Sequence, residues 1–324
     1  MIFVETGHAP SLHAAISLCL RIFKICVHLP FLYNQKITSV MKKISTLVFA
    51  LVFGCLLLAG CDKIEGDFYE IVNSEDVTVE FPPVDPSTVY RKVLLEEFTG
   101  HRCTNCPAGH AVLESLHQQY GDTLVTVGIH YGSLAKPVGS VFNYDFRTEY
   151  GDLIGDYYTI DAIPAAIVNR VYEYGGWSRD HWANVVSEVD RSKVYAALQV
   201  INEFNEHSKK LKANVKVTML KDFGNPLRIV LFVIEDGIVK PQKDGDQDIL
   251  DYVHNHVLRA SLTNTFGFPL RNGSALWVAS DTETYAASIS MANTDWVPEN
   301  CSVVAFLYDE TTEEVIQVEQ VPVK

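Results

Sequence analysis

Basic residues are scarce in this chain of 324 residues. It has 26 lysines and arginines against 40 aspartates and glutamates, a formal net charge of −14 at pH 7. Residues 1–60 hold five of the basic residues and one of the acidic residues. A chain that begins at residue 61 therefore has 21 basic and 39 acidic residues, a net charge of −18. Such an acidic surface repels nucleic-acid phosphates and anionic lipid headgroups. The composition therefore argues against nucleic acid as a partner and against electrostatic attachment to a membrane.

The apolar stretch 44–58 is too short for a comfortable membrane span. It follows Met41 and two lysines, and its length is typical of the apolar part of a secretion signal. It leads into Leu58-Ala59-Gly60-Cys61, a tetrad that resembles the lipobox of bacterial lipoproteins, in which the cysteine is acylated after cleavage. We interpret 41–60 as a lipoprotein signal peptide and Cys61 as the lipidated residue that joins the protein to a membrane. The alternative is a plain N-terminal anchor helix.

Residues 1–40 show no clear pattern and lie upstream of a self-sufficient signal. We interpret them as a mis-assigned upstream extension, with Met41 as the true first residue. The alternative is a genuine extension, which would bury the signal and block normal export. Residues 61–87 are acidic, polar and proline-bearing, which predicts a tether with one short strand at 77–81.

Cysteine is also sparse, and only four of the seven cysteines lie at or after residue 61. Cys61 is assigned to lipid. Cys301 lies in an apolar segment, where it is expected to pack as a small hydrophobic residue. Cys103 and Cys106 remain as a pair, and because disulfides persist outside the cytoplasm, redox chemistry of this pair is permitted there.

Cys103 and Cys106 stand three residues apart, after the apolar run 93–98 and before a predicted helix. Backbone N–H groups and the helix dipole at such a point stabilise a thiolate on the first cysteine, and the second can close a disulfide with it. His101, Arg102 and His110 are nearby in sequence and are expected to favour the thiolate. Two alternatives stay open: a permanent structural disulfide, and half of a zinc site with His101 and His110 as the nearest further ligands.

Strands and helices alternate through residues 88–193. The pattern predicts a helix at 108–120, a buried strand at 124–130 and a final helix at 178–191. An insertion at 132–157 is expected to be partly helical around 144–151 and to shape a groove over the cysteines. Strands that alternate with helices predict a central sheet with helices on both faces.

Residues 194–324 change character, because apolar segments are separated by turn signals and none has a helical period of any length. Strands are predicted at 212–218, 227–234, 301–308 and 315–318, the last two as a hairpin around 309–314. This pattern predicts an antiparallel β-sandwich. The predicted fold class is therefore an α/β domain followed by an all-β domain.

The segment Tyr158-Thr159-Ile160-Asp161-Ala162-Ile163-Pro164 carries the Y-x-I-x-x-I-P pattern of thioredoxins, and Glu97-Phe98 precedes Cys103 as a buried acid and phenylalanine do there. Residues 89–193 therefore resemble a thioredoxin-like domain. The resemblance implies a cis peptide bond before Pro164, packed against the cysteine pair, with backbone open to a substrate strand. It also implies that Glu97 accepts the proton of Cys106, while Cys103 is the attacking thiolate.

The combination of lipobox, thioredoxin-like domain and sandwich resembles the outer-membrane-protein-28-related lipoproteins. The matching residues are Glu96-Glu97-Phe98-Thr99-Gly100, Cys103-Thr104-Asn105-Cys106-Pro107 and Tyr252-Val253-His254-Asn255-His256-Val257-Leu258-Arg259. The resemblance spans nearly all of the chain after the signal and implies surface location on a Gram-negative cell. It implies little about chemistry.

Other side chains suggest weaker sites. His254 and His256 share one strand face and could bind a metal, although such histidines more often form hydrogen bonds. Four acidic residues suggest a calcium loop, but Ile249 stands where that loop requires glycine, which favours a solvated acidic loop. These four are Asp244, Asp246, Asp248 and Asp251. The aromatic residues Tyr172, Tyr174 and Trp177 either rim a binding surface or pack as a hairpin. No metal or cofactor is predicted.

The sequence supports two functions. One is an envelope thiol–disulfide oxidoreductase that acts through Cys103 and Cys106 on thiol or disulfide partner proteins. The other is a non-catalytic surface binding protein or adhesin, in which the pair is a structural disulfide and the sandwich makes the contacts. Either protein is expected at the outer membrane, anchored by lipid and facing the periplasm or the cell surface.

Overall fold

The computed structural model describes residues 70–72, 77, 79–171 and 175–324, which form a mixed α/β fold made mostly of sheets. The predicted signal peptide, Cys61, Tyr172 and Tyr174 lie outside the described residues. Within those residues, no helix has both the length and the apolar composition to cross a membrane. Short 3-10 helices lie at Pro86–Thr88, Gly121–Thr123, Ser133–Ala135, Leu270–Gly273 and Pro298–Asn300.

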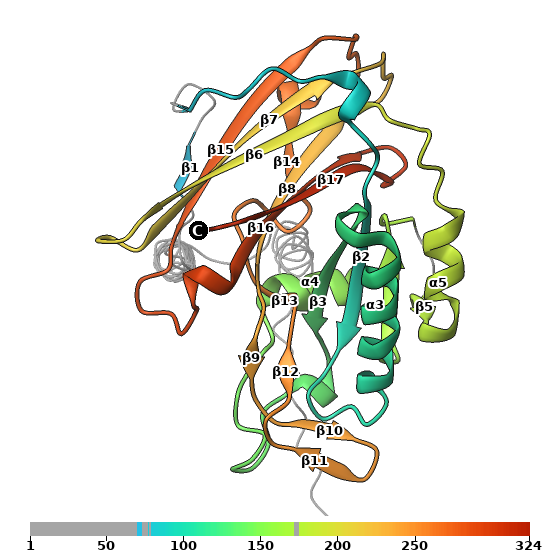
Figure 1. Ribbon diagram of the computed structural model, residues 1–324, viewed down its shortest axis with the longest axis vertical. Helices are drawn as coiled ribbons and strands as arrows, with labels where there is room; N and C mark the ends of the chain where they lie inside the picture. The colour runs from blue at the N-terminus through green and yellow to red at the C-terminus, as the bar shows by residue number, and fades with distance from the viewer. Residues whose placement is uncertain (1–69, 73–76, 78, 172–174) are drawn as a thin grey trace, which may run out of the picture. The chain divides into compact units, whose positions relative to one another are not determined.

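One large sheet runs through the described part of the chain, with the strand order β17-β16-β8-β13-β3-β2-β4-β5 and with β14 paired to β8 (Figure 1). Its strands are β2 (Val93–Thr99), β3 (Leu124–His130), β4 (Ala165–Val168), β5 (Trp177–Ser178), β8 (Leu227–Glu235), β13 (Val257–Ser261), β14 (Phe268–Pro269), β16 (Cys301–Asp309) and β17 (Val315–Pro322). Strand β3 pairs in parallel with β2 and β13, and the other neighbours pair antiparallel.

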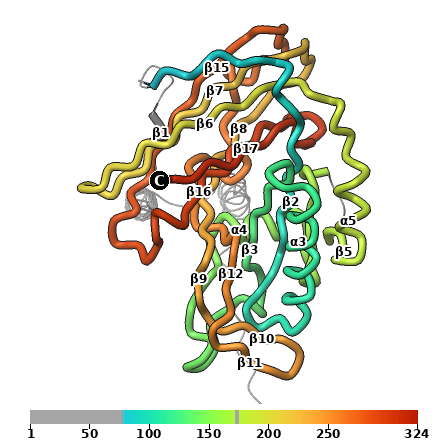
Figure 2. Tube along the Cα trace, viewed as in Figure 1, coloured from blue at the N-terminus to red at the C-terminus, as the bar shows by residue number. Residues whose placement is uncertain are grey.

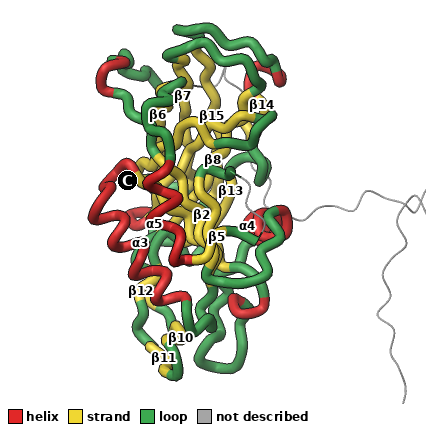
Figure 3. Tube along the Cα trace, turned by 90° about the vertical axis from the view of Figure 1, so that its right-hand side faces the viewer, coloured by secondary structure: helices red, strands yellow, loops and turns green. Residues whose placement is uncertain are grey.

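Helices cover both faces of the β2–β3 region, as the sequence predicts. Figure 3 shows α3 (Cys106–Tyr120) and α5 (Arg179–Glu188) on one side of the strands and α4 (Glu149–Tyr157) on the other. Strands β2 and β3 are buried along their whole length. Successive residues of a strand point to opposite faces, so Val93 joins the core under α3 and α5 while Leu94 joins the core under α4.

Several element boundaries differ from the predicted ones. Helix α5 ends at Glu188 rather than at 191, and the helix of the insertion covers Glu149–Tyr157 rather than 144–151. The strand predicted at 77–81 is wrong, because residues 77 and 79–81 are not in a strand. The late hairpin is confirmed by the pairing of β16 with β17.

A second, antiparallel sheet lies against part of the large one. Its strands, in the order β1-β15-β7-β6, are β1 (Glu70–Val72), β15 (Thr282–Ser290), β7 (Lys210–Met219) and β6 (Ala196–Asn205). A buried apolar core joins the two sheets, with Val215 on one side and Leu231 and Ala305 on the other. Cys301 lies in this core, as predicted, and burial raises the pKa of its thiol to about 12.

The large sheet crosses the predicted boundary between residues 193 and 194. Strands β8, β13, β16 and β17 follow that boundary in sequence, yet they extend the sheet that contains β2 and β3. The two parts of the sheet meet where β13 pairs with β3. Val257 pairs with Gly128, and the Gly128 N–H donates to the His256 carbonyl oxygen at 2.6 Å. A side chain at residue 128 would meet that oxygen, since a Cβ there would lie 3.2 Å from it. The domain boundaries themselves stay predictions.

Two pairs of short strands, the second within the loop of the first, extend from the large sheet toward the start of α3. Strand β9 (Ile238–Val239) pairs with β12 (Val253–His254), and β10 (Gln242–Asp244) pairs with β11 (Gln247–Ile249). The path of the chain in Figure 2 places β10 and β11 at the end of the sheet where β2 leads into α3. The cysteine pair lies at this end.

Candidate functional site

Cys103 and Cys106 form a disulfide at the start of α3, with their Cα atoms 5.4 Å apart. Cys103 follows the turn after β2, and Cys106 is the first residue of the helix. Pro107 fits the first helical turn because the N–H that it lacks has no partner within a helix there. The predicted placement of the pair between a buried strand and a helix is confirmed.

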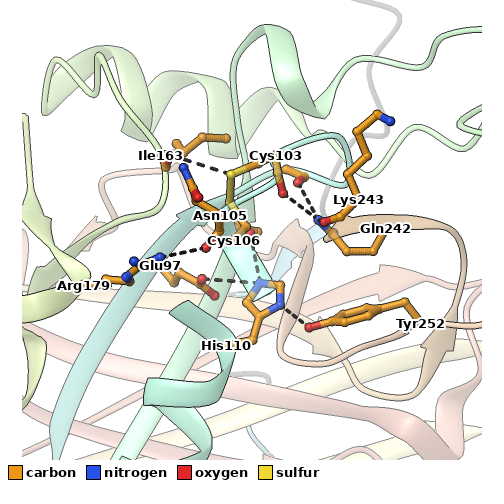
Figure 4. Close-up of a disulfide and its surroundings, with 12 residues drawn as sticks. Glu97, Cys103, Asn105, Cys106, His110, Ile163, Arg179, Gln242, Lys243 and Tyr252 are labelled. Atoms are coloured by element: carbon orange, nitrogen blue, oxygen red, sulfur yellow. Dashed lines mark hydrogen bonds and ion pairs between the residues drawn. A yellow bond between two sulfur atoms is a disulfide. The ribbon is translucent and has the colours of Figure 1, made fainter. Parts of the chain in front are cut away.

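The residue before Pro164 lies beside the disulfide. The Ile163–Pro164 peptide bond is cis, as predicted, and the Ile163 carbonyl oxygen lies 3.7 Å from Sγ of Cys103 (Figure 4). Gly109 of α3 permits this approach, because a Cβ on it would lie 3.2 Å from Cβ of Pro164 and 3.4 Å from Oε1 of Glu97. Residues from β2, α3 and the loop before β4 thus meet around the two sulfur atoms.

Glu97 lies on β2 with its carboxyl group buried. Burial raises the pKa of this carboxyl to about 8, since a charge is poorly solvated there. Its Oε1 atom has no hydrogen-bond partner among the described residues, although Nε2 of His110 lies 3.4 Å away. Figure 4 shows Glu97 and His110 on the Cys106 side of the disulfide.

The two histidines near the pair are uncharged near neutral pH and so do not support a thiolate by positive charge. The ring of His101 stacks on Phe142 with their centroids 5.6 Å apart, and burial lowers the pKa of His101 to about 4. Burial likewise lowers the pKa of His110 to about 4. The guanidinium of Arg102 donates to the carbonyl oxygens of Lys136 and Ser133 in the insertion. The helix N-terminus and the adjacent Arg102 guanidinium are the groups that remain to support a thiolate at Cys103.

A cavity of about 340 Å³ lies beside α3 and β12. Glu97 and Tyr252 line it together with the imidazoles of His110, His117, His130, His254 and His256. This histidine cluster is missed by sequence reasoning, because its members come from separate elements. A pair of histidines two residues apart, at 254 and 256, is the one local signal for it.

No metal site forms from these groups. His254 and His256 do not act together: the ring of His256 stacks on His117 at 5.0 Å, while Nε2 of His254 lies 3.2 Å from the Lys240 carbonyl oxygen. In the described part of the chain, no group of three or more histidines, cysteines, aspartates and glutamates is placed to hold a metal ion. Asp248 of β11 instead pairs with Lys243 at 2.7 Å, so the acidic segment is a hairpin, not a calcium loop.

The disulfide is almost completely covered, with 2% of Cys103 and 0% of Cys106 exposed. Much of the cover is the β10–β11 hairpin. Nε2 of Gln242 donates to the Cys103 carbonyl oxygen at 3.0 Å, and the Lys243 N–H donates to the His101 carbonyl oxygen at 2.8 Å. The Gly245 N–H donates to the Thr104 carbonyl oxygen at 3.1 Å. The only local sign of this hairpin in the sequence is Asp244-Gly245-Asp246, a turn-forming triplet.

The insertion closes the other side of the cysteine loop. The Arg102 N–H donates to the Leu134 carbonyl oxygen at 3.0 Å. Gly100 packs against the same backbone, since a Cβ on it would lie 2.9 Å from the carbonyl carbon of Leu134. The loop 100–105 is therefore held between the insertion and the β10–β11 hairpin.

The family of the chain follows from its C-terminal half. The sequence model of the family described as outer membrane protein Omp28 matches residues 152–324, more than half of the chain. The chain belongs to the Omp28 family of outer membrane proteins. The match begins after the cysteine pair, so family membership says nothing about the chemistry of Cys103 and Cys106.

Solved structures are similar to the chain at low sequence identity. HBP35 of Porphyromonas gingivalis is 15% identical, with 72% of this chain and 76% of that chain covered and a TM-score of 0.51, which shows a shared fold alone. A protein of Agrobacterium tumefaciens is 12% identical over 73% of this chain and 96% of that chain, with a TM-score of 0.46. A domain of the outer membrane lipoprotein Omp28 from Porphyromonas gingivalis is 23% identical over 40% of this chain and 89% of that chain, with a TM-score of 0.27. No curated protein matches the chain.

Proposed function

We propose that this member of the Omp28 family is a lipid-anchored outer-membrane protein whose Cys103–Cys106 pair exchanges disulfides with partner proteins. The catalytic unit is a thioredoxin-like arrangement of β2, α3, β3 and β4. The proposal rests on the surroundings of the disulfide, with the Ile163 carbonyl oxygen on the Cys103 side and the Glu97 carboxyl on the Cys106 side.

The reaction needs no cofactor. In the reduced protein, the Cys103 thiolate attacks a partner disulfide, forms a mixed disulfide and expels one partner sulfur as a thiolate. Cys106 then gives its proton to the Glu97 carboxylate and attacks Sγ of Cys103, which expels the second partner sulfur. The cysteine pair is oxidised and the partner disulfide is reduced to two thiols. The reverse sequence oxidises a partner dithiol.

The buried carboxyl group of Glu97 and its raised pKa are the main support for the proposal. A buried carboxyl group with an oxygen that has no hydrogen-bond partner costs stability, and a purely structural disulfide does not need such a group. Groups with strongly shifted pKa values next to a reactive atom are typical of active sites. With its pKa at about 8, Glu97 can both take up and release a proton near neutral pH.

Cys106→Ser tests the proposal in intact cells. The variant keeps Cys103 and loses the thiol that resolves a mixed disulfide, so partner proteins are expected to accumulate in complexes that a reductant dissolves. Cys103→Ser is the matched control and is expected to trap far fewer partner proteins, because it lacks the attacking thiol. If Cys106→Ser traps no partner at normal abundance, exchange is not the function of the pair.

Burial of the disulfide favours a second function. With 2% and 0% of the two cysteines exposed, and with the β10–β11 hairpin bonded across them, the pair also fits a structural staple in a surface binding protein. The rate at which the Cys103–Cys106 disulfide is reduced distinguishes an exchange site from a structural staple. An exchange site is reduced by a mild thiol while the protein stays folded, and Cys103 is then alkylated first. A staple resists the thiol until the protein unfolds.

Anchoring is proposed through Cys61, which lies outside the described residues. The tetrad Leu58-Ala59-Gly60-Cys61 supports it, and the acidic chain offers no electrostatic alternative. Cys61→Ser is expected to remove the acyl chains and to shift the protein from the membrane fraction to the soluble envelope fraction. Unchanged membrane association would contradict the anchor. Protease treatment of intact cells then reports which side of the outer membrane the protein faces.

A further inference from the structure

His110 connects the buried carboxyl of Glu97 to the histidine-lined cavity. Its Nε2 atom lies 3.4 Å from Oε1 of Glu97 and 3.0 Å from Oγ1 of Thr99. Its Nδ1 atom lies 2.6 Å from the hydroxyl oxygen of Tyr252, which comes from the segment between β11 and β12. Both Glu97 and Tyr252 line the cavity of about 340 Å³. One imidazole thus has a nitrogen toward the buried acid and a nitrogen toward a more accessible hydroxyl group (Figure 4).

The position of His110 follows from the helix. Residues four apart lie on the same face of an α-helix, so His110 stands one turn beyond Cys106 on the face that looks toward β2. On the Gly109 side the surroundings of Glu97 are apolar, since the ideal Cβ position of Gly109 is close to the Trp182 ring and Pro164 as well as to Oε1 of Glu97. A proton on Glu97 can leave through a polar group, and Nε2 of His110 lies 3.4 Å from Oε1 of Glu97.

Building on the exchange reaction proposed above, we propose that His110 is a positioning residue that relays the Cys106 proton from Glu97 to Tyr252 and the cavity. The thiol proton passes to the Glu97 carboxylate, Nε2 accepts the proton from the resulting acid, and Nδ1–H releases one to the Tyr252 oxygen or to water in the cavity. The imidazole starts and ends neutral in opposite tautomers, and the cavity gains the proton that Cys106 loses. The expelled partner thiolate takes a proton from solvent.

The surroundings of His110 keep its ring neutral, which the relay requires because an imidazolium has no free lone pair. Burial and the charge of His256 lower the pKa of His110 to about 4. The titratable groups that face it are Glu97 on β2, Tyr252, His256 and the more distant His130 and His254. Of these, Tyr252 lies 2.6 Å from Nδ1 and Glu97 lies 3.4 Å from Nε2, so transfer from Glu97 requires the two groups to approach by a few tenths of an ångström or to share one water.

A two-phase exchange experiment on the whole protein separates the steps. Reduced protein is mixed with dithiobis(nitrobenzoate) in a stopped-flow instrument. Attack by Cys103 releases the first coloured thiolate, and attack by Cys106 releases the second. His110→Gln is expected to leave the first phase unchanged and to slow the second by about tenfold or more at neutral pH, because positioned proton transfer typically contributes that much. His117→Gln is the matched control, since His117 lines the same cavity from the same helix and bonds to Thr126 instead. It should leave both phases unchanged.

Chemical rescue distinguishes a relay from a structural role. His110→Ala opens space beside the cavity, and added imidazole is expected to restore the second phase. N-methylimidazole accepts a proton at one nitrogen but cannot release one from the other, so it should not. Equal rescue by both compounds would overturn the relay, as would a second phase of wild-type rate in His110→Gln. If His110→Gln does not fold, Tyr252→Phe removes the outer acceptor and should also slow only the second phase.

The outcome separates the relay from the exchange reaction. A wild-type protein that shows neither phase while folded contradicts the proposed exchange function itself. Two phases in the wild type with no effect of His110→Gln contradict the relay alone and leave exchange intact. Solvent deuterium should slow the second phase of the wild type more than that of His110→Gln.

Discussion

Glu97 places a buried carboxyl group beside the disulfide. It lies within an apolar strand whose seven residues are all buried. Its neighbour Glu96 is buried as well, but that carboxylate accepts two hydrogen bonds from Arg170 at 2.8 and 3.0 Å. Two adjacent glutamates therefore differ in their surroundings: Glu96 is paired with Arg170, while burial favours the protonated form of Glu97.

Glu97→Gln is predicted to remove a pH dependence of stability. Below pH 4.5 the carboxyl is neutral in both states. As the pH rises, the unfolded chain ionises from about 4.5 while the folded protein keeps the proton up to about 8, so the free energy of unfolding falls between these values. The difference between a pKa of 4.5 in the unfolded chain and about 8 in the folded protein corresponds to a loss on the order of 4 kcal/mol over this range.

Urea unfolding of the oxidised protein at pH 5 and pH 8 measures this effect. Wild-type stability should fall relative to that of Glu97→Gln between the two pH values. Glu114→Gln, which changes an exposed glutamate of α3, is the matched control and should keep the wild-type dependence. Parallel profiles for the wild type and Glu97→Gln would show that Glu97 titrates normally.

Among the elements, the β10–β11 hairpin is expected to affect access to the disulfide, because it bonds to the loop that holds Cys103. It comes from the second half of the chain and bonds to the backbone of the loop that holds Cys103. Gln242 is completely buried, and its amide N–H groups reach the carbonyl oxygens of Cys103 and Gly100. The hairpin is therefore expected to limit how often the sulfur atoms become accessible.

Gln242→Ala is predicted to speed reduction of the folded protein. Loss of the amide removes two hydrogen bonds to the cysteine loop, which costs about 1–2 kcal/mol and lets the hairpin open more often. We expect reduction by a mild thiol to become several-fold faster, measured by alkylation and mass spectrometry. Lys243→Ala is the control, because the Lys243 side chain contacts Asp248 and the ring of Phe142 rather than the loop that holds the cysteines. Equal rates for Gln242→Ala and the wild type would show that the hairpin does not limit access.

At the scale of the whole molecule, the halves on either side of residue 193 share one sheet and one core. Arg91, which precedes β2, donates to the Val315 carbonyl oxygen at 2.8 Å and pairs with Glu314 at 2.6 Å. The core under α4 contains Ile129 from the first half and Phe232 and Phe306 from the second. The cysteine site therefore depends on residues that the predicted second domain supplies.

A fragment of residues 77–193 is predicted not to fold cooperatively. Without residues 194–324, one edge of β3 loses its partner β13, and the apolar face under α4 loses Phe232 and Phe306. Thermal unfolding followed by circular dichroism measures this, with the fragment 77–324 as the control. A cooperative transition of the short fragment near that of the longer one would support the boundary predicted at residue 193.

The sequence by itself determined the local features of the site. The cysteine spacing, the strand before it, the helix after it and the cis peptide bond before Pro164 could be predicted, because each depends on residues within a few positions of one another or on a recognisable short pattern. Only the tertiary structure decided what surrounds them. The hairpin that covers the disulfide, the histidines beside Glu97 and the shared sheet join residues far apart in the chain, such as Gln242 and Cys103, 139 positions apart. Contacts of that range arise from the packing of whole elements, which short-range preferences and periodicity do not encode.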